Sequence, residues 1–241
     1  MPEIRSLDSF RIKIFADGAD IDGIFAMYEK SWVSGLTTNP TLMKKSGVKN
    51  YREFAQEVLK IVRDKPISFE VFSDNFEEMK KQALEISSWG DNVFVKIPIT
   101  NTKGISSGDL IESLSNQGVK LNVTAMMTLE QVKLALSRIN QDVENFLSVF
   151  AGRVADTGRN PLTLIQDCLE AIGQSKTSEL IWASPREFFN LVQADSIGCH
   201  VITMTNDILA KAKLINMDLR DYSLETVKMF YDDARLAGYE L

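Results

Sequence analysis

A lysine lies within a short apolar run whose composition is typical of a buried strand. The run extends over Asn92–Pro98, with Lys96 at its fifth position. Charged side chains are rare in such strands unless they are paired or used. Burial lowers the pKa of a lysine, and a neutral amine can attack a carbonyl carbon to form a Schiff base. The alternative is that Lys96 ends a strand or pairs with a carboxylate, and this segment alone favours that alternative.

Polar side chains recur near the carboxyl ends of the other predicted strands. Taken singly, each has a structural explanation: Asp17 can cap a helix, Asn39 can lie in a turn, and Glu70 can neutralise a nearby ammonium. Together they favour a functional site, because polar groups buried side by side without a function are costly. The set consists of Asp17, Asn39, Glu70, Lys96, Asn122, Thr124, Ser148 and Ser184.

Two arginines and a serine form a second candidate group. Arg153 follows a predicted strand, and Ser184-Pro185-Arg186 stands at the predicted start of a helix. Two guanidinium groups and a hydroxyl near a helix N-terminus suit a phosphate dianion. The alternative is that the arginines pair with surface acids such as Asp156 and Glu187.

Strands and helices are predicted to alternate along the whole chain. Eight strands with helices between them are typical of a (β/α)8 TIM barrel, and an open doubly wound sheet is the rival. The predicted strands are Arg11–Asp17, Gly35–Asn39, Ile67–Phe72, Asn92–Pro98, Lys120–Ala125, Phe146–Ala151, Glu179–Ser184 and His200–Thr205. The predicted helices are Asp20–Ser31, Asn50–Arg63, Asn75–Ser88, Thr128–Arg138, Asn160–Ile172 and an additional C-terminal helix, Ser223–Ala237.

Spacing favours the barrel over the open sheet. Glu70, Lys96, Asn122 and Ser148 follow one another at intervals of 26 residues, which is a steady length for a strand–helix unit. The glycine-rich dinucleotide motif expected of the rival fold does not follow the first strand. In a barrel, side chains alternate between the interior and the helices, and the active site lies at the carboxyl ends of the strands.

The same alternation orients the candidate side chains. If the apolar residues Val95 and Ile97 face the helices, Lys96 points into the barrel. Equivalent phasing of the other strands turns Asp17, Glu70 and Asn122 inward as well. The sequence therefore predicts that the polar set converges at one end of the barrel.

Composition narrows the class of protein. The 241 residues include 44% hydrophobic and 25% charged residues and carry a net charge of −6, which argues against nucleic acid as the main partner. Apolar runs are too short to span a membrane, and Met1–Arg5 does not begin a signal peptide. The cysteines Cys168 and Cys199 are expected to be reduced, and with a single histidine, His200, no metal site is expected. We expect a cytoplasmic protein with one domain over residues 1–241.

Ordered motifs resemble those of the transaldolase family, including its shorter bacterial members and the related fructose-6-phosphate aldolases. The resemblance runs from Phe15 to about Asp207. Thr-Thr-Asn-Pro-Thr-Leu at positions 37–42 and Val-Lys-Ile-Pro at positions 95–98 are its specific pieces. The other pieces are Phe15-Ala16-Asp17, Phe69-Glu70-Val71, Asn122-Val123-Thr124, Ser148–Arg153 and Ala183–Arg186.

The resemblance implies an aldol exchange through a Schiff base, without a cofactor. Lys96 would attack the ketone of a ketose phosphate and form an iminium, and Asp17 would move the proton of the C4 hydroxyl. Glu70 and Thr124 would hold the water that shuttles protons. The implied substrate contacts are Asn39, Asn122 and Ser148 for hydroxyl groups, and Arg153, Ser184 and Arg186 for the phosphate.

Two positions separate the branches of this family. Glu70 and Phe150 favour transaldolases, because the aldolase branch tends to have glutamine and tyrosine there. A tyrosine hydroxyl at position 150 could help water release dihydroxyacetone, and phenylalanine cannot. We therefore expect transfer of a dihydroxyacetone unit from a ketose phosphate, such as fructose 6-phosphate or sedoheptulose 7-phosphate, to an aldose phosphate, as in the pentose phosphate pathway. The alternatives are an aldolase that releases dihydroxyacetone, a transaldolase for a modified sugar phosphate, and a non-catalytic sugar-phosphate-binding barrel.

Three residues depart from the family pattern. Gly18, Val149 and Pro185 stand where many members have threonine, proline and phenylalanine. None of them removes a proposed catalytic group, but Val149 and Pro185 neighbour proposed substrate contacts and so bear on which sugar binds. Relatives of this length commonly assemble into rings, so the resemblance also implies a homo-oligomer, such as a pentamer or decamer.

Overall fold

Eight parallel strands close into a barrel in which each strand pairs with the next along the chain and β8 pairs with β1. The computed structural model describes residues 6–173 and 175–240, so Met1–Arg5, where no signal peptide is expected, lies outside the described residues. The strands are β1 Lys13–Asp17, β2 Val33–Thr37, β3 Ile67–Glu70, β4 Val93–Pro98, β5 Leu121–Met126, β6 Asn145–Val149, β7 Ser178–Trp182 and β8 Val201–Thr205. The predicted (β/α)8 barrel is confirmed.

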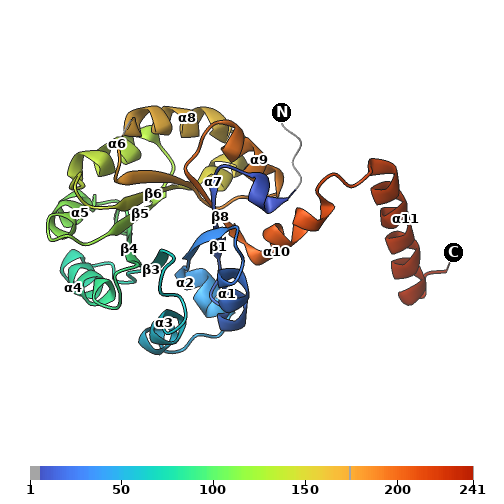
Figure 1. Ribbon diagram of the computed structural model, residues 1–241, viewed down its shortest axis with the longest axis horizontal. Coiled ribbons are helices and arrows are strands. Elements are labelled where there is room, and N and C mark those ends of the chain that lie inside the picture. Colours follow the sequence, from blue (N-terminus) through green and yellow to red (C-terminus); the bar gives the residue numbers. More distant parts are fainter. Residues whose placement is uncertain (1–5, 174, 241) are drawn as a thin grey trace.

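Helices surround the barrel and separate successive strands (Figure 1). They are α1 Ile21–Tyr28, α2 Pro40–Lys45, α3 Tyr51–Leu59, α4 Phe76–Ser87, α5 Gly108–Ser115, α6 Leu129–Arg138, α7 Ala151–Asp156, α8 Pro161–Ile172, α9 Phe189–Ser196, α10 Asn206–Leu209 and α11 Leu219–Leu236, with short 3-10 turns η1 Leu7–Ser9 and η2 Ala210–Leu214. Within the described residues, no helix is long and apolar enough to cross a membrane. The six predicted helices are present, and a capping box of Thr128 and Gln131 begins α6.

Two apolar cores lie on the two faces of the sheet. The larger core fills the space between strands and helices and includes Val93, Val95 and Ile97 of β4. A smaller core lies inside the barrel and contains Phe15, Phe94, Phe146, Ile181, Ala183 and Val201. The predicted alternation along the strands is therefore confirmed, with Lys96 on the inner face.

The inner core forms an aromatic floor beneath the carboxyl ends of the strands. The Phe146 ring contacts the rings of Phe15 and Phe94, with centroid distances of 5.4 Å and 4.4 Å. Side chains two residues apart on a strand point to the same face. The residues that lie two positions after these phenylalanines on β1, β4 and β6 therefore lie above this floor. Those residues are Asp17, Lys96 and Ser148.

Strand register places three of the polar residues at one level. Glu70 pairs with Lys96, and Lys96 pairs with Asn122, as the 26-residue spacing predicts. The alignment does not extend to Ser148 of β6 in spite of the equal spacing, because Asn122 pairs with Phe146. Ser148 therefore lies two residues further toward the carboxyl end than Asn122.

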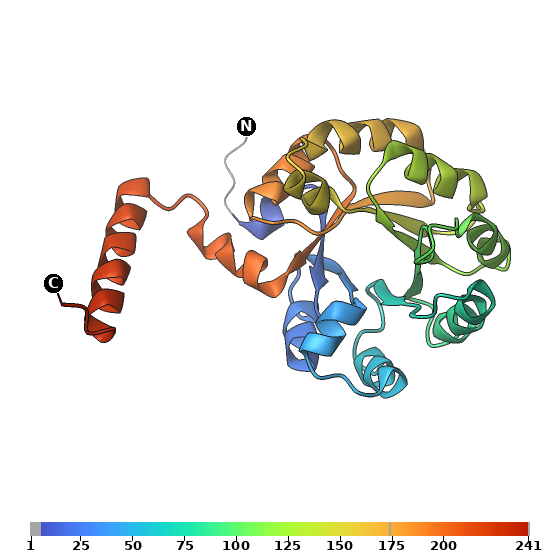
Figure 2. The same cartoon turned by 180° about the vertical axis from the view of Figure 1, so that it is seen from behind.

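The last helix departs from the barrel. α11 lies away from the strands in both views of the molecule and is connected to β8 through α10 and η2 (Figures 1 and 2). None of the residues of α11 that the structure describes is buried. The predicted C-terminal helix, Ser223–Ala237, is present but begins four residues earlier, at Leu219, where Asp218 accepts hydrogen bonds from the backbone N–H groups of Arg220 and Asp221.

Candidate active site

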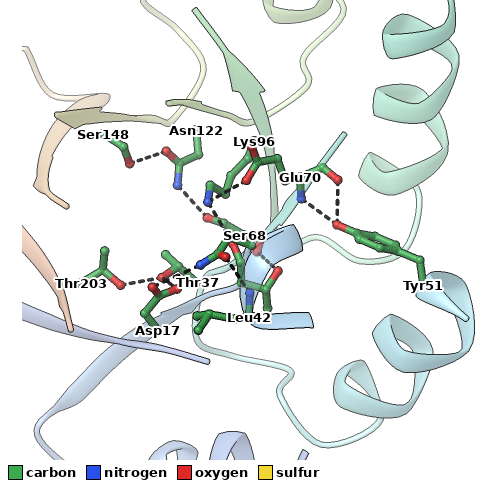
Figure 3. Close-up of polar contacts among 12 residues, drawn as sticks. Asp17, Thr37, Leu42, Tyr51, Ser68, Glu70, Lys96, Asn122, Ser148 and Thr203 are labelled. Carbon is green, nitrogen blue, oxygen red and sulfur yellow. Dashed lines mark hydrogen bonds and ion pairs between the residues drawn. The ribbon is translucent and has the colours of Figure 1, made fainter. Parts of the chain in front are cut away.

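The Lys96 ammonium lies at the carboxyl end of the barrel interior. Its side chain is almost fully buried, and its Nζ lies 3.1 Å from Oε2 of Glu70 and donates a hydrogen bond to the Thr38 carbonyl at 2.9 Å (Figure 3). The carboxylate partner of the structural alternative is therefore present. The Glu70 side chain remains 19% exposed, so the pair is not sealed from small molecules.

Asp17 ends β1 within a chain of hydrogen bonds. The Thr37 hydroxyl donates to Oδ1 of Asp17 at 2.8 Å and also contacts the Thr203 hydroxyl (Figure 3). Because a hydroxyl has one proton, Thr203 must donate to Thr37 in this arrangement. Asn39 Nδ2 lies 3.4 Å from Oδ2 of Asp17 and donates to it, while its Oδ1 caps α2 by accepting from the Leu42 N–H.

Burial controls the protonation of Asp17. Loss of water around the carboxylate raises its pKa above the ordinary aspartate value. The positive charge of Lys96 and the hydrogen bonds from Thr37 and Asn39 act in the opposite direction but do not cancel the effect of burial. Asp17 therefore holds a proton more strongly than an exposed aspartate does.

Asn122 is oriented by hydrogen bonds on both sides. Its Nδ2 donates to the Ser68 hydroxyl at 3.0 Å, and its Oδ1 accepts from the Ser148 hydroxyl at 2.7 Å. All three side chains are buried, and Figure 3 shows Asn122 between the other two. Among the described residues, the second N–H of the Asn122 amide makes no hydrogen bond, and the fixed amide plane sets its direction.

Thr124 differs from its neighbours because its hydrogen-bonding capacity is unused. The Thr124 hydroxyl, on β5, is buried and has no hydrogen-bond partner among the described residues. Buried hydroxyl groups nearly always have a partner, so a free one inside a polar site marks a position for water or substrate.

The second group lies on the loops that follow β6 and β7. A Cβ at Gly152 would lie 1.6 Å from the Ser184 carbonyl oxygen, so only glycine permits this contact between α7 and the loop after β7. Ser184 itself has a positive φ of 59°. The close contact brings the segments of Arg153 and Arg186 together.

The two arginines have different partners. The Arg153 guanidinium lies 5.6 Å from the centre of the Phe150 ring, a cation–π contact. Arg186 forms a two-pronged ion pair with Asp156, so for this residue the surface pairing that the sequence left open is present. Both arginines are exposed.

One prediction about this region is wrong. The helix expected to start at Ser184–Arg186 begins at Phe189, because the Asn190 side chain accepts hydrogen bonds from the backbone N–H groups of Arg186 and Glu187 and holds them in a turn. Ser184 also lies beyond β7, which ends at Trp182. A helix N-terminus therefore does not contribute to the group at Ser184.

Four side chains of the site were not predicted. Ser68 lies two residues before Glu70 and could have been found from the same alternation, as could Thr37 at the end of β2 and Thr203 in the middle of β8. Tyr51 comes from α3, and its hydroxyl forms hydrogen bonds with the backbone of Glu70. No strand pattern could have signalled a residue at the start of a helix.

Neither the two cysteines nor the acidic side chains of the described residues add a reactive thiol or a metal site. Cys168 and Cys199 are free and buried, and burial raises the pKa of each thiol to about 12. Across residues 6–173 and 175–240, no three His, Cys, Asp or Glu side chains converge in a group that could hold a metal ion.

Known proteins resemble this chain over nearly its whole length. The family model described as Transaldolase/Fructose-6-phosphate aldolase matches residues 14–238. A probable transaldolase of Thermoanaerobacter sp. is 32% identical over 231 residues, which are 95% of this chain and 100% of the relative. A probable transaldolase of Streptococcus agalactiae is 34% identical over 222 residues, 92% of this chain and 98% of the relative. One of Methanococcus maripaludis is 34% identical over 211 residues, 87% of this chain and 93% of the relative.

The residues matched by the family model, 14–238, include every residue of the site from Asp17 to Arg186. The site that they enclose contains a buried amine, two carboxylates and hydroxyl and amide groups above an aromatic floor. The chain belongs to the transaldolase/fructose-6-phosphate aldolase family, and it is an enzyme of the transaldolase-like aldolase type.

Proposed function

We propose that this enzyme transfers a dihydroxyacetone unit from a ketose phosphate to an aldose phosphate through a Schiff base on Lys96. The observation that carries the proposal is the position of the Lys96 amine, which is 7% exposed, lies above an apolar floor and is 3.1 Å from the Glu70 carboxylate. An amine held in this way can become the neutral nucleophile once its proton has moved to the neighbouring carboxylate or to water. The Schiff base supplies the electron sink, so the exchange needs no cofactor.

The first stage joins substrate to enzyme. The Lys96 nitrogen bonds to the C2 ketone carbon, and the carbonyl oxygen takes up a proton to give a carbinolamine. The carbinolamine then loses this oxygen as water and becomes the iminium. Glu70 and Thr124 hold the water that carries protons in both steps, and the unused buried hydroxyl of Thr124 supports this role.

The second stage breaks and remakes a carbon–carbon bond. Asp17 takes the proton of the C4 hydroxyl while the electrons of the C3–C4 bond move into the iminium, so an aldehyde leaves and an enamine remains. When the enamine attacks the acceptor aldehyde, Asp17 returns the proton to the new alkoxide. The raised pKa of Asp17 suits this role, because a carboxylate with a raised pKa is a stronger base at the operating pH.

The remaining groups recognise the substrate. Asn39, Asn122 and Ser148 orient the hydroxyl groups of the three-carbon unit, which the fixed amide planes of both asparagines support. Arg153, Ser184 and Arg186 hold the phosphate on the loops after β6 and β7. Arg186 uses Nε and Nη2 to bind Asp156, which leaves Nη1 for a phosphate oxygen.

Phe150 favours transfer over release of dihydroxyacetone. Its ring packs against the inner core and under the Arg153 guanidinium, and it has no hydroxyl that could activate water beside the enamine. The sugar phosphates of the pentose phosphate pathway, such as fructose 6-phosphate and sedoheptulose 7-phosphate, are the substrates that we propose first. A modified sugar phosphate is the second possibility, because Val149 and Pro185 lie next to the groups that contact the substrate.

We also propose that the enzyme forms a homo-oligomer through α11, consistent with a ring of subunits. A helix with a wide apolar face normally packs that face against another element, yet this one lies away from its own barrel (Figures 1 and 2). A second copy would cover it without leaving water on its aromatic side chains. The exposed apolar side chains are Leu219, Tyr222, Leu224, Val227, Met229, Phe230, Tyr231 and Leu236.

Trapping with borohydride tests the Schiff base. Fructose 6-phosphate and borohydride should attach a reduced sugar adduct to Lys96, and mass spectrometry of the digested protein should find it there. Lys96→Ala should lose both the adduct and the transfer activity, because no second amine occupies this position. Lys81→Ala, which removes an exposed lysine on α4, is the control and should keep both. Wild-type protein that remains unmodified at Lys96 would contradict the mechanism.

The dependence on acceptor separates transfer from release. With fructose 6-phosphate as donor, we expect formation of glyceraldehyde 3-phosphate to depend on added erythrose 4-phosphate, because the enamine is protected from water. Chromatography of the products should find sedoheptulose 7-phosphate and little free dihydroxyacetone. Equal rates with and without the acceptor would favour an aldolase. Sugar binding with no exchange of labelled carbon would favour a non-catalytic barrel.

Replacement of Asp17 by asparagine should lower the activity and raise the free energy of unfolding. Asp17→Asn should lower kcat roughly 10²- to 10⁴-fold, the usual contribution of a general acid–base group. The folded pKa of Asp17 is raised, so the wild-type protein loses stability as pH rises from the unfolded pKa, about 3.9, through the folded pKa. The free energy of unfolding of Asp17→Asn relative to wild type should therefore increase between pH 3 and pH 7, as measured by urea denaturation.

The control for this comparison is Asp22→Asn, which changes an exposed carboxyl group on α1. It should leave kcat unchanged. A stability difference for Asp17→Asn that shrinks as the pH rises would show that burial does not disfavour the charged form of Asp17.

Light scattering during gel filtration tests the oligomer. The wild-type chain should elute with a mass several times that of one subunit, and Phe230→Glu should reduce the mass because it places a charge in the apolar face of α11. Lys228→Glu is the matched control, since Lys228 lies on the opposite, polar side of the same helix. A monomeric wild-type protein, or equal effects of the two variants, would contradict the proposal.

A further inference from the structure

At its carboxyl end, β3 remains paired with β4 but is no longer paired with β2. β3 and β2 pair only through Leu36 with Ile67 and Thr37 with Ser68, whereas β3 and β4 stay paired as far as Glu70 and Lys96. The last backbone bond toward β2 runs from the Thr38 N–H to the Ser68 carbonyl at 3.1 Å. Beyond Thr38 the chain turns into α2, so the backbone of Glu70 faces a gap in the ladder.

Two features of this sequence prevent the ladder from continuing. In a parallel pair, the Glu70 N–H would next donate to the Thr38 carbonyl, and the Glu70 carbonyl would accept from the N–H of residue 40. The Thr38 carbonyl accepts from Lys96 Nζ instead, at 2.9 Å. Residue 40 is a proline and has no N–H. Both backbone groups of Glu70 therefore need another partner.

A single tyrosine hydroxyl supplies both partners. The Tyr51 hydroxyl accepts from the Glu70 N–H at 2.8 Å and donates to the Glu70 carbonyl at 2.8 Å, and Figure 3 shows the ring reaching from α3 to this backbone. Burial raises the pKa of the Tyr51 hydroxyl, so it keeps the proton that it donates. The hydroxyl thus takes the place of the missing stretch of β2.

The position of the ring leaves the hydroxyl little freedom. Tyr51 is the first residue of α3, directly after Asn50, whose side chain caps the helix by accepting from the Glu53 N–H. The ring packs against Phe69 and Trp89, with centroids 6.4 Å and 6.0 Å away. A rigid aromatic group therefore connects α3 to the last residue of β3.

We propose that Tyr51 is a positioning residue that holds the Glu70 carboxylate at the distance from Lys96 that the Schiff-base steps require. The inference rests on the proposed function, because it assigns Tyr51 a role only through the proton transfers of Glu70. Tyr51 does not touch the reacting atoms. Its effect is to fix the backbone from which the catalytic carboxylate extends.

Tyr51→Phe tests the proposal, since it removes the hydroxyl and keeps the packed ring. We expect kcat for transfer from fructose 6-phosphate to fall about 10- to 100-fold, the size of effect expected from a misplaced catalytic group. The rate at which borohydride traps the Lys96 adduct in a single turnover should fall by the same factor. KM for the donor should change less than about twofold, because the phosphate and hydroxyl contacts are unchanged. Tyr28→Phe removes a hydroxyl bonded to Asp64 on the outside of the barrel and should have no effect.

A double-mutant cycle separates positioning from general destabilisation. In a Glu70→Gln background the carboxylate is already lost, so Tyr51→Phe should lower kcat by less than about twofold, whereas independent effects would multiply. Multiplied effects, a wild-type rate in Tyr51→Phe, or loss of its circular dichroism spectrum at the assay temperature would overturn the role of Tyr51.

If the wild-type protein transfers nothing and forms no adduct, the proposed function itself fails. A loss of rate in Glu70→Gln with none in Tyr51→Phe would reject only the positioning role.

Discussion

The buried charge of Lys96 is the constraint around which the top of the barrel is arranged. An ammonium removed from water needs a carboxylate and hydrogen-bond acceptors close by, or it loses its proton. Glu70 and the Thr38 carbonyl supply them from the two preceding strands. The chain turns into α2 at Pro40, which has no N–H, so β2 does not continue its ladder along β3, and the backbone of Glu70 takes its partner from outside the sheet. The end of β2, the charge in β4 and the packing of α3 therefore meet at Glu70.

The polar side chains of the site are of two kinds: those oriented by hydrogen bonds within the protein, and one whose hydroxyl has no partner among the described residues. Asp17, Asn39 and Asn122 are each oriented by at least two contacts, so they can meet a substrate without first being ordered. Thr124 has a buried hydroxyl with no partner among the described residues. This combination is typical of a preorganised site, in which fixed groups bind the reactant and the open position admits a small molecule.

Much of this architecture can be predicted from residue patterns, because a barrel repeats the same rules at every strand. The alternation of Val93, Val95 and Ile97 is enough to turn Lys96 inward, and equal spacing is enough to align Glu70 with Asn122. Equal spacing fails for Ser148 because the offset between neighbouring strands is set by how the barrel closes. The turn at Ser184–Arg186 was not foreseen because it depends on the Asn190 side chain, four residues further on. Tyr51 could not be foreseen, since its contact with Glu70 exists only once α3 packs on β3.

The contact between Gly152 and the Ser184 carbonyl has a consequence for how this enzyme can change. The start of α7 and the loop after β7 meet backbone to backbone, with no side chain between them, so neither segment can be remodelled alone. A substitution at position 149 or 185 that shifts one segment will displace the other, and with it the second arginine. Adaptation to a new sugar is therefore expected to proceed by paired substitutions in both segments, while position 152 stays glycine. The two segments are expected to change together in evolution, although Gly152 and Ser184 are 32 positions apart in the sequence.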